Sequence, residues 1–134
     1  MRAHTLLKAA ICLFILALAV PAFAQVRASF DMSTPFWAGG AKLPAGSYTA
    51  QSTGEEGNLL QIKSNDGSHT VILDCRQSNT LTKGAPQIIF NKYGDADYVA
   101  AVHTQTQSVD ILPAGPEKAA AKKGKPQQHS VTGK

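Results

Sequence analysis

The amino-acid sequence predicts an all-β fold: a single antiparallel β-sandwich or small barrel of about seven short strands. Three observations support this prediction. Apolar and polar residues alternate with a period of two from residue 25 onward, and turn residues recur at intervals of about 8–12 residues. Residues 25–116 contain no stretch with the 3.6-residue apolar period of an amphipathic helix. Both closures of the sheet satisfy these observations.

The predicted strands are bounded by recognisable turns. An Asn-Asp-Gly turn at residues 65–67 joins two strands as a hairpin, with Gly67 in the left-handed region of backbone space. A second hairpin turns around Gly94, and a third passes through the polar segment 104–107. The seven predicted strands are residues 26–32, 47–52, 58–64, 69–75, 86–91, 97–103 and 108–112.

The tetrapeptide Leu-Pro-Ala-Gly occurs twice, at residues 43–46 and 112–115. In the first copy the proline and glycine suit a turn that leads into a strand. In the second copy Pro116 follows directly, keeps Gly115 out of a helix and ends the strand ladder. The two copies are therefore interpreted as turns, and not as a sequence repeat or a cell-wall anchoring signal.

Residues 1–24 have the pattern of a cleaved signal peptide. Two positive charges precede an uncharged apolar run at residues 9–20, and the segment ends in Ala22-Phe23-Ala24, which predicts cleavage before Gln25. The apolar run is shorter than the roughly 20 residues that cross a bilayer. We therefore expect an exported protein, periplasmic or extracellular, that does not span the membrane after cleavage.

Charge divides the remaining chain into two parts. Residues 25–116 hold six basic and eight acidic side chains, a net charge of −2, and are expected to form one β domain. Residues 117–134 hold five lysines and one glutamate and are expected to be a disordered Lys-rich tail that touches anionic surfaces weakly. Because the domain itself has no positive field, we expect no nucleic-acid partner.

Cys75 is the one cysteine that remains after removal of residues 1–24, so no internal disulfide can form. It ends an apolar strand, and a buried, inert thiol is the favoured interpretation. The alternatives are an intermolecular disulfide or a reactive thiol, with His69 or His103 as its base, in a hydrolase or redox enzyme.

No motif predicts a catalytic residue, a cofactor or a metal site. The two histidines could reach a zinc ion only together with Cys75 or Asp74, and no short ligand spacing supports that arrangement. Asp95 and Asp97, two residues apart on a turn, are interpreted as a solvated hairpin tip. We therefore expect a non-catalytic protein without a cofactor.

Aromatic residues near turns are the best candidates for a binding surface. Trp37, Tyr93 and Tyr98 could stack on sugar rings of a polysaccharide or another cell-envelope component, although packing against the ends of a small β core is the favoured interpretation. The leading hypothesis is an exported, non-catalytic β-domain that acts as a structural or binding module. Its alternatives are envelope binding through these aromatic residues and Cys75-dependent catalysis.

Four ordered segments carry a resemblance to a known family. FWAGGAKLPAGSYT (36–49), LQIKSNDG (60–67), IIFNKYGD (88–95) and DILPAGPE (110–117) together resemble a family of small exported bacterial β-proteins of unknown function. Its pattern is a signal peptide followed by G-x-x-L-P-A-G-x-Y, F-x-[RK]-Y-G-D and L-P-x-x-x-x-E. The chain departs from it at Asn91, where histidine is frequent, and at Ala114-Gly115. The resemblance implies a compact β fold and export, and implies no reaction.

Overall fold

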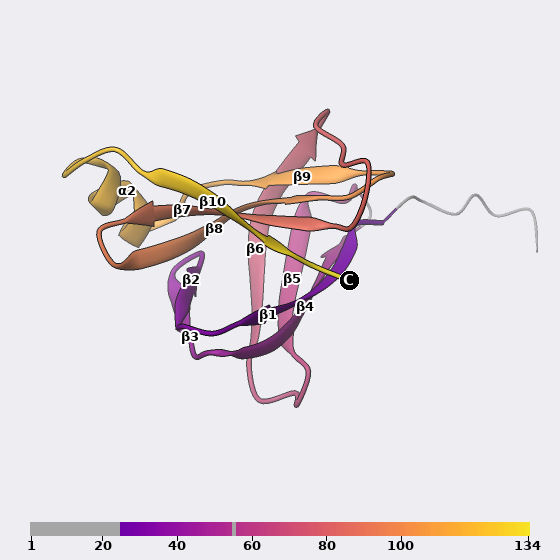
Figure 1. Ribbon diagram of the computed structural model, residues 1–134, viewed down its shortest axis with the longest axis horizontal. Coiled ribbons are helices and arrows are strands. Elements are labelled where there is room, and N and C mark those ends of the chain that lie inside the picture. The colour runs from indigo at the N-terminus through magenta and orange to yellow at the C-terminus, as the bar shows by residue number, and fades with distance from the viewer. Residues whose placement is uncertain (1–24, 55) are drawn as a thin grey trace, which may run out of the picture.

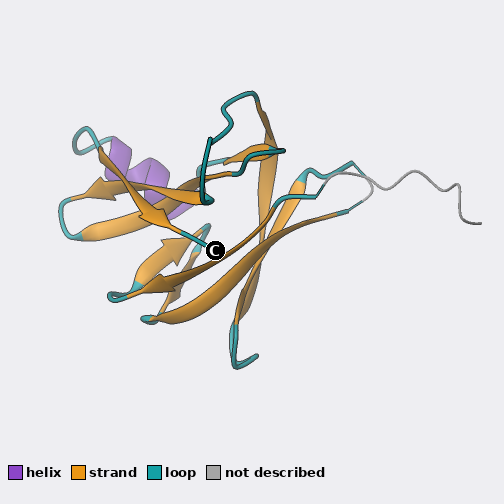
Figure 2. Ribbon diagram, turned by 45° about the vertical axis from the view of Figure 1, so that its right-hand side comes forward, coloured by secondary structure: helices purple, strands orange, loops and turns teal. Residues whose placement is uncertain are grey.

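The computed structural model describes residues 25–54 and 56–134, and the expected signal peptide lies outside the described residues. The all-β prediction is confirmed, because the described chain consists of strands and one short helix (Figures 1 and 2). The strands are β1 (Arg27–Met32), β2 (Phe36–Ala38), β3 (Ala41–Leu43), β4 (Gly46–Thr53), β5 (Leu59–Ser64), β6 (Thr70–Ser78), β7 (Gln87–Tyr93), β8 (Ala96–His103), β9 (Ser108–Ile111) and β10 (Gln127–Thr132), and the helix is α2 (Gly115–Ala121).

All seven predicted strands are present, as β1 and β4 to β9. Their turns are also as expected, with Gly67 at φ 80° and Gly94 at φ 60°. The prediction of about seven strands was nevertheless too low, because β2, β3 and β10 were not anticipated. The strands β2 and β3 form a hairpin of only three residues each, which is too short to show an alternation in the sequence.

The strands form two layers that meet at β6. The order β1–β4–β5–β6 makes one layer, and β9, β8, β7 and β10 make the other. The first half of β6 pairs with β5 and its last four residues pair with β9, so this strand belongs to both layers. Figure 1 shows the two layers crossing each other, an arrangement in which strands that change layer form the corners.

The sheet is mixed, which corrects the prediction of a purely antiparallel one. The ladder pairs are antiparallel except between β2 and β8, which run parallel and meet at Trp37 and Tyr98. The short β2 reaches β8 beside β9 because β9 covers only the C-terminal part of β8. This one contact brings two aromatic side chains together on adjacent strands.

The outer edge of β1 is joined to the C-terminal end of the chain. The amide of Lys134 donates to the Ser29 carbonyl at 2.8 Å, and the Ser29 amide donates back at 3.3 Å. The neighbouring Gly133 amide donates to the Pro86 carbonyl at 2.8 Å. The residues that follow β10 therefore tie the outer edge of β1 to the start of β7, although β1 and β10 form no strand ladder.

The C-terminal segment is ordered, contrary to the prediction of a disordered tail for residues 117–134. Strand β10 pairs with β7 over six residues, and Val131 packs against the core. The sequence predicted that Pro116 would keep Gly115 out of a helix. Gly115 instead begins α2, because Pro116 stands in the first helical turn, where a backbone amide hydrogen would have no helical partner. The polar, lysine-rich composition of this segment predicted disorder, but composition does not take account of the backbone hydrogen bonds that the edge of β7 supplies to β10.

The core lies between the two layers and is centred on Phe36. The Phe36 ring makes edge-to-face contacts with Tyr48 at 5.0 Å, Phe90 at 5.9 Å and Phe30 at 6.0 Å between centroids. These residues come from β2, β4, β7 and β1, so one side chain connects both layers.

Among the described residues, no helix has the length and hydropathy of a membrane span.

Candidate functional site

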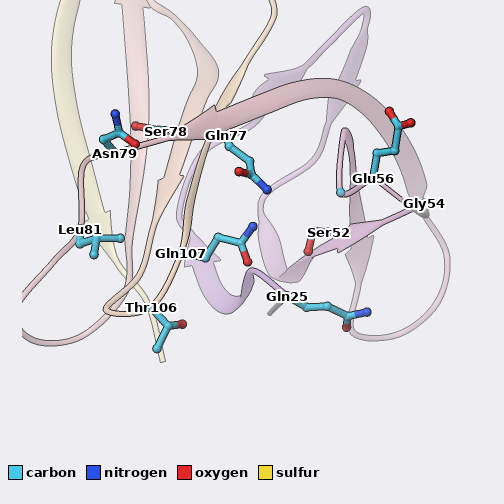
Figure 3. Close-up of a pocket in the computed structure, with 11 residues that line it drawn as sticks. Gln25, Ser52, Gly54, Glu56, Gln77, Ser78, Asn79, Leu81, Thr106 and Gln107 are labelled. Atoms are coloured by element: carbon cyan, nitrogen blue, oxygen red, sulfur yellow. The ribbon is translucent and has the colours of Figure 1, made fainter. Parts of the chain in front are cut away.

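A cleft with a volume of about 1110 Å³ lies among turns and strand ends of the described chain (Figure 3). Four separate segments meet there: Gln25 ahead of β1, the end of β4 with the turn to β5, the end of β6 with the chain that follows, and the β8–β9 turn. The strands of both layers thus end around one opening. We call this opening the amide-lined cleft after the residues described next.

Amide and hydroxyl side chains dominate the lining. The amides belong to Gln25, Gln77, Asn79 and Gln107, and hydroxyl groups are added by Ser52, Ser78 and Thr106. Each amide offers two donor hydrogens and one acceptor oxygen, and each hydroxyl offers one donor and an acceptor oxygen. In Figure 3 the side chains of Gln77 and Gln107 point into the same opening. The lining therefore suits a ligand with several neutral donors and acceptors.

Gln107 is held by the tight β8–β9 turn. The backbone amide of Gln107 donates to the Thr104 hydroxyl at 3.1 Å, and its backbone carbonyl accepts from the Thr104 backbone amide at 3.2 Å. The adjacent Ser108 is fully buried and accepts a bond from the same Thr104 amide. The side-chain oxygen Oε1 of Gln107 is buried and has no hydrogen-bond partner in the described chain. A buried acceptor without a partner is uncommon, and any donor that reached it would remove its free-energy cost.

The opposite wall begins at the first residue of the β domain. Val26 is fully buried, and its amide donates to the Ser52 hydroxyl at 2.9 Å. Its carbonyl accepts from the Ser52 amide at 2.9 Å. These bonds fix the chain at residue 26, so Gln25 stands at the edge of the amide-lined cleft with its side chain exposed.

The cleft carries little charge and one apolar side chain of note. Of its described lining residues, only Glu56 is charged at neutral pH. Leu81 is 51% exposed, one of the largest exposures of a big apolar side chain in the described chain. The lining residues are thus mostly polar, in contrast to the mostly hydrophobic and aromatic lining of typical small-molecule sites.

The three aromatic residues proposed from the sequence do meet, but in a different place. Trp37 stacks on Tyr98 with centroids 5.8 Å apart, and Tyr93 meets Tyr98 edge to face at 5.8 Å. Tyr98 is buried, at 6% exposure, whereas Trp37 and Tyr93 are half-buried. The group is thus partly packed and partly exposed. We call it the aromatic cluster.

Helix α2 covers one side of the aromatic cluster and adds an acidic group. The Tyr98 hydroxyl donates to the Pro116 carbonyl at 3.5 Å, and Asn91 donates to Glu117 at 3.2 Å. Burial raises the pKa of the Glu117 carboxyl above its ordinary value, and the Asn91 hydrogen bond opposes that shift. Burial and the nearby Glu117 charge raise the pKa of the Tyr93 hydroxyl.

Cys75 lies in the core, as favoured from the sequence. It is 4% exposed, and its thiol donates to the Gly57 carbonyl at 3.7 Å. Burial, followed by the Asp74 charge, raises the pKa of the thiol, so the nucleophilic thiolate is disfavoured.

The histidines named as possible bases stand apart from Cys75. His69 precedes it by six residues along an extended strand, a separation of about 20 Å. His103 pairs with Ser108, whereas Cys75 pairs with Ile111 on the same strand. Across residues 25–54 and 56–134, no three His, Cys, Asp or Glu side chains gather as metal ligands would. Asp97, which was interpreted with Asp95 as a solvated hairpin tip, is buried, and its carboxyl oxygen lies 2.7 Å from the His129 ring nitrogen of β10.

The amide-lined cleft was not anticipated from the sequence. Its residues are spread over four turns and strand ends, and each alone has the character of an ordinary polar surface residue. No spacing rule connects Gln25 with Gln107; only the pairing of strands does.

Comparisons with protein-family models, with curated proteins and with solved structures find no match for this chain.

Proposed function

We propose that this chain is an exported, non-catalytic binding module whose amide-lined cleft holds a neutral, hydroxyl-rich ligand of the cell envelope, such as a polysaccharide. Export is supported by the charge, apolar run and small residues of segment 1–24. Binding is supported by the geometry of the cleft. The absence of a catalytic step is supported by the buried Cys75 thiol and its raised pKa.

The observation that carries the proposal is the unpaired side-chain oxygen of Gln107. Leaving a buried acceptor without a partner costs about 1–3 kcal/mol. A hydroxyl group donates to such an oxygen and accepts from the neighbouring amides in the same contact. A row of hydroxyls on one ligand would therefore pair with several lining residues at once.

The size and charge of the cleft narrow the ligand class further. A volume of about 1110 Å³ is slightly above the range of small-molecule sites, about 300–1,000 Å³, and fits a segment of several linked rings. The low charge of the lining favours a neutral polymer over a polyanion. The exposed Leu81 offers a surface for the C–H face of a ring.

The test compares Gln107→Met with the wild-type protein. Methionine has nearly the same length and removes both polar groups, so the unfolding free energy should rise by about 1 kcal/mol in urea denaturation because no acceptor stays buried without a partner. Affinity for a ligand that uses this oxygen should fall about tenfold, which corresponds to about 1.4 kcal/mol. Binding is measured by affinity electrophoresis in a neutral soluble glucan and by co-sedimentation with peptidoglycan sacculi.

Gln61→Met is the matched control, because Gln61 lies on β5 outside the cleft lining and its replacement should leave binding unchanged. Equal affinity of wild type and Gln107→Met would contradict the proposed site. A wild-type protein that binds neither probe would contradict the polysaccharide class.

The aromatic cluster supports a second candidate site for the same class of ligand. Trp37 is half-buried and stacks on Tyr98, so its remaining surface could carry a sugar ring. Trp37→Ala would then abolish binding while Gln107→Met retains it. The reverse result assigns binding to the cleft, and outright unfolding of Trp37→Ala assigns Trp37 to packing.

A further inference from the structure

The first residue of the described chain occupies a defined place in the amide-lined cleft. Val26 is locked by its two hydrogen bonds to Ser52, so the residue before it has little freedom to leave the wall. Gln25 lines the cleft and is exposed. Its side-chain oxygen accepts from the Gln51 amide at 3.5 Å, a long bond that holds the carboxamide weakly.

Gln25 is also the residue at which signal-peptide cleavage is expected to expose an α-amine. A glutamine in that position carries a nucleophilic amine and a carboxamide on one residue, in reach of a five-membered ring. The amine nitrogen attacks the side-chain carbonyl carbon and forms a new C–N bond. The bond to the carboxamide nitrogen breaks, and that nitrogen leaves as ammonia with the proton from the amine. The step uses no oxidant and no second reactant.

We propose that the mature chain begins with a pyroglutamyl residue at position 25, and that its neutral lactam forms part of the wall of the amide-lined cleft. The inference rests on the proposed export and deepens the proposed binding function. Exposure of Gln25 and its weak bond to Gln51 leave the carboxamide free to turn onto its own amine.

Ring closure changes the electrostatics of the cleft. A free α-amine has a pKa of about 7.7–8.0 and would place a positive charge at the wall near neutral pH. The lactam removes that charge and presents one N–H donor and one carbonyl acceptor. These groups match the neutral amide chemistry of Gln77 and Gln107 across the opening.

The experiment uses the full chain, with its own residues 1–24, exported from a bacterial host. The intact protein is weighed by mass spectrometry, and its amines are labelled before digestion so that the N-terminal peptide can be read. The expected mass is that of residues 25–134 less one ammonia, with label on lysines but none on the N-terminus. Gln25→Asn is the matched control, because its shorter carboxamide cannot close a five-membered ring and should leave a labelled α-amine.

The results that would contradict the proposal distinguish a failure of ring closure from a failure of signal-peptide cleavage. A chain that begins at Gln25 with a labelled amine would overturn ring closure and leave export standing. A chain that begins at another residue, or that retains residues 1–24, would overturn both the modification and the cleavage on which it depends.

Discussion

Glu117 of helix α2 holds its carboxyl group in a buried position, with 7% of the residue exposed, beside Asn91 and near the Tyr93 hydroxyl of the aromatic cluster. Charge is disfavoured there because water is displaced and the Asn91 amide replaces it only in part. The folded protein therefore binds this proton more tightly than the unfolded chain. The free energy of unfolding consequently decreases as the pH rises from 4.5, the ordinary pKa of a glutamate carboxyl, through the raised pKa of Glu117 in the folded state.

Replacing Glu117 with glutamine should remove that decrease. We expect Glu117→Gln to be more stable than the wild type at neutral pH, and the difference to vanish below pH 4.5, where the carboxyl is protonated in both states. Urea denaturation across this range measures it. Glu56→Gln removes an exposed carboxylate and serves as the control. A stability difference that does not change with pH would show that the Glu117 charge is not penalised by folding.

At the scale of single residues, the sequence located the aromatic side chains but not their surroundings. Trp37, Tyr93 and Tyr98 were identified because large rings near turns either cap a core or bind a ligand. The Trp37–Tyr98 contact depends on a parallel pairing of β2 with β8 that no local pattern encodes, whereas Tyr93 and Tyr98 meet within the hairpin of β7 and β8. The burial of Glu117 escaped prediction for the same reason, since its neighbours come from distant strands.

At the scale of elements, hairpins marked by a recognisable turn were predictable, whereas the three-residue strands β2 and β3 and the isolated strand β10 were not. The turns around Gly67 and Gly94 have local chemistry that defines the strands on either side. Strand β10 has no such turn and a polar sequence, and it forms because β7 offers an unpaired edge. Its closing contact depends on Gly133, where an added Cβ would lie 2.8 Å from the Ser29 carbonyl oxygen and 3.1 Å from Ile88.

Gly133→Ala should therefore weaken the junction between β10 and β1. The Ser29 carbonyl belongs to a strand and cannot move aside easily, so we expect a loss of about 1–3 kcal/mol of unfolding free energy. Hydrogen exchange of the Ser29 amide should accelerate at the same time. Gly124→Ala is the matched control, because nothing lies within 4 Å of its added Cβ and its cost should stay within about 0.5 kcal/mol. Equal stability of the two variants would argue against a closing role for this segment.

At the scale of the whole molecule, Cys75 reports on the integrity of the core. It is the one cysteine of residues 25–134, and its 4% exposure means that a thiol reagent reaches it only when the structure opens. We expect labelling of the native protein to be slower than that of the urea-unfolded protein by about a thousandfold or more. Cys75→Ser controls for labelling at other groups. Fast labelling in the native state, or a reducible dimer, would instead favour the Cys75-dependent alternative.

The fold class was predictable because alternation and turns repeat throughout the chain, whereas the cleft was not. Its walls belong to residues 25, 52, 54, 56–57, 77–79, 81 and 106–107, which come together only when both layers are in place. The same is true of the exchange of β6 between layers. Long-range strand pairing supplies this information, and a single sequence does not display it.

The hydrogen bonds between Ser29 and Lys134 place the first strand and the last residues of the described chain side by side. A short peptide bridging these ends would leave every ladder pair intact. The exposed turn at Asn65–Gly67 could then serve as the new pair of termini, because it contributes no lining residue to the amide-lined cleft. The strand pairing does not depend on where the chain begins, and a circularly permuted chain should therefore fold with the same strand order.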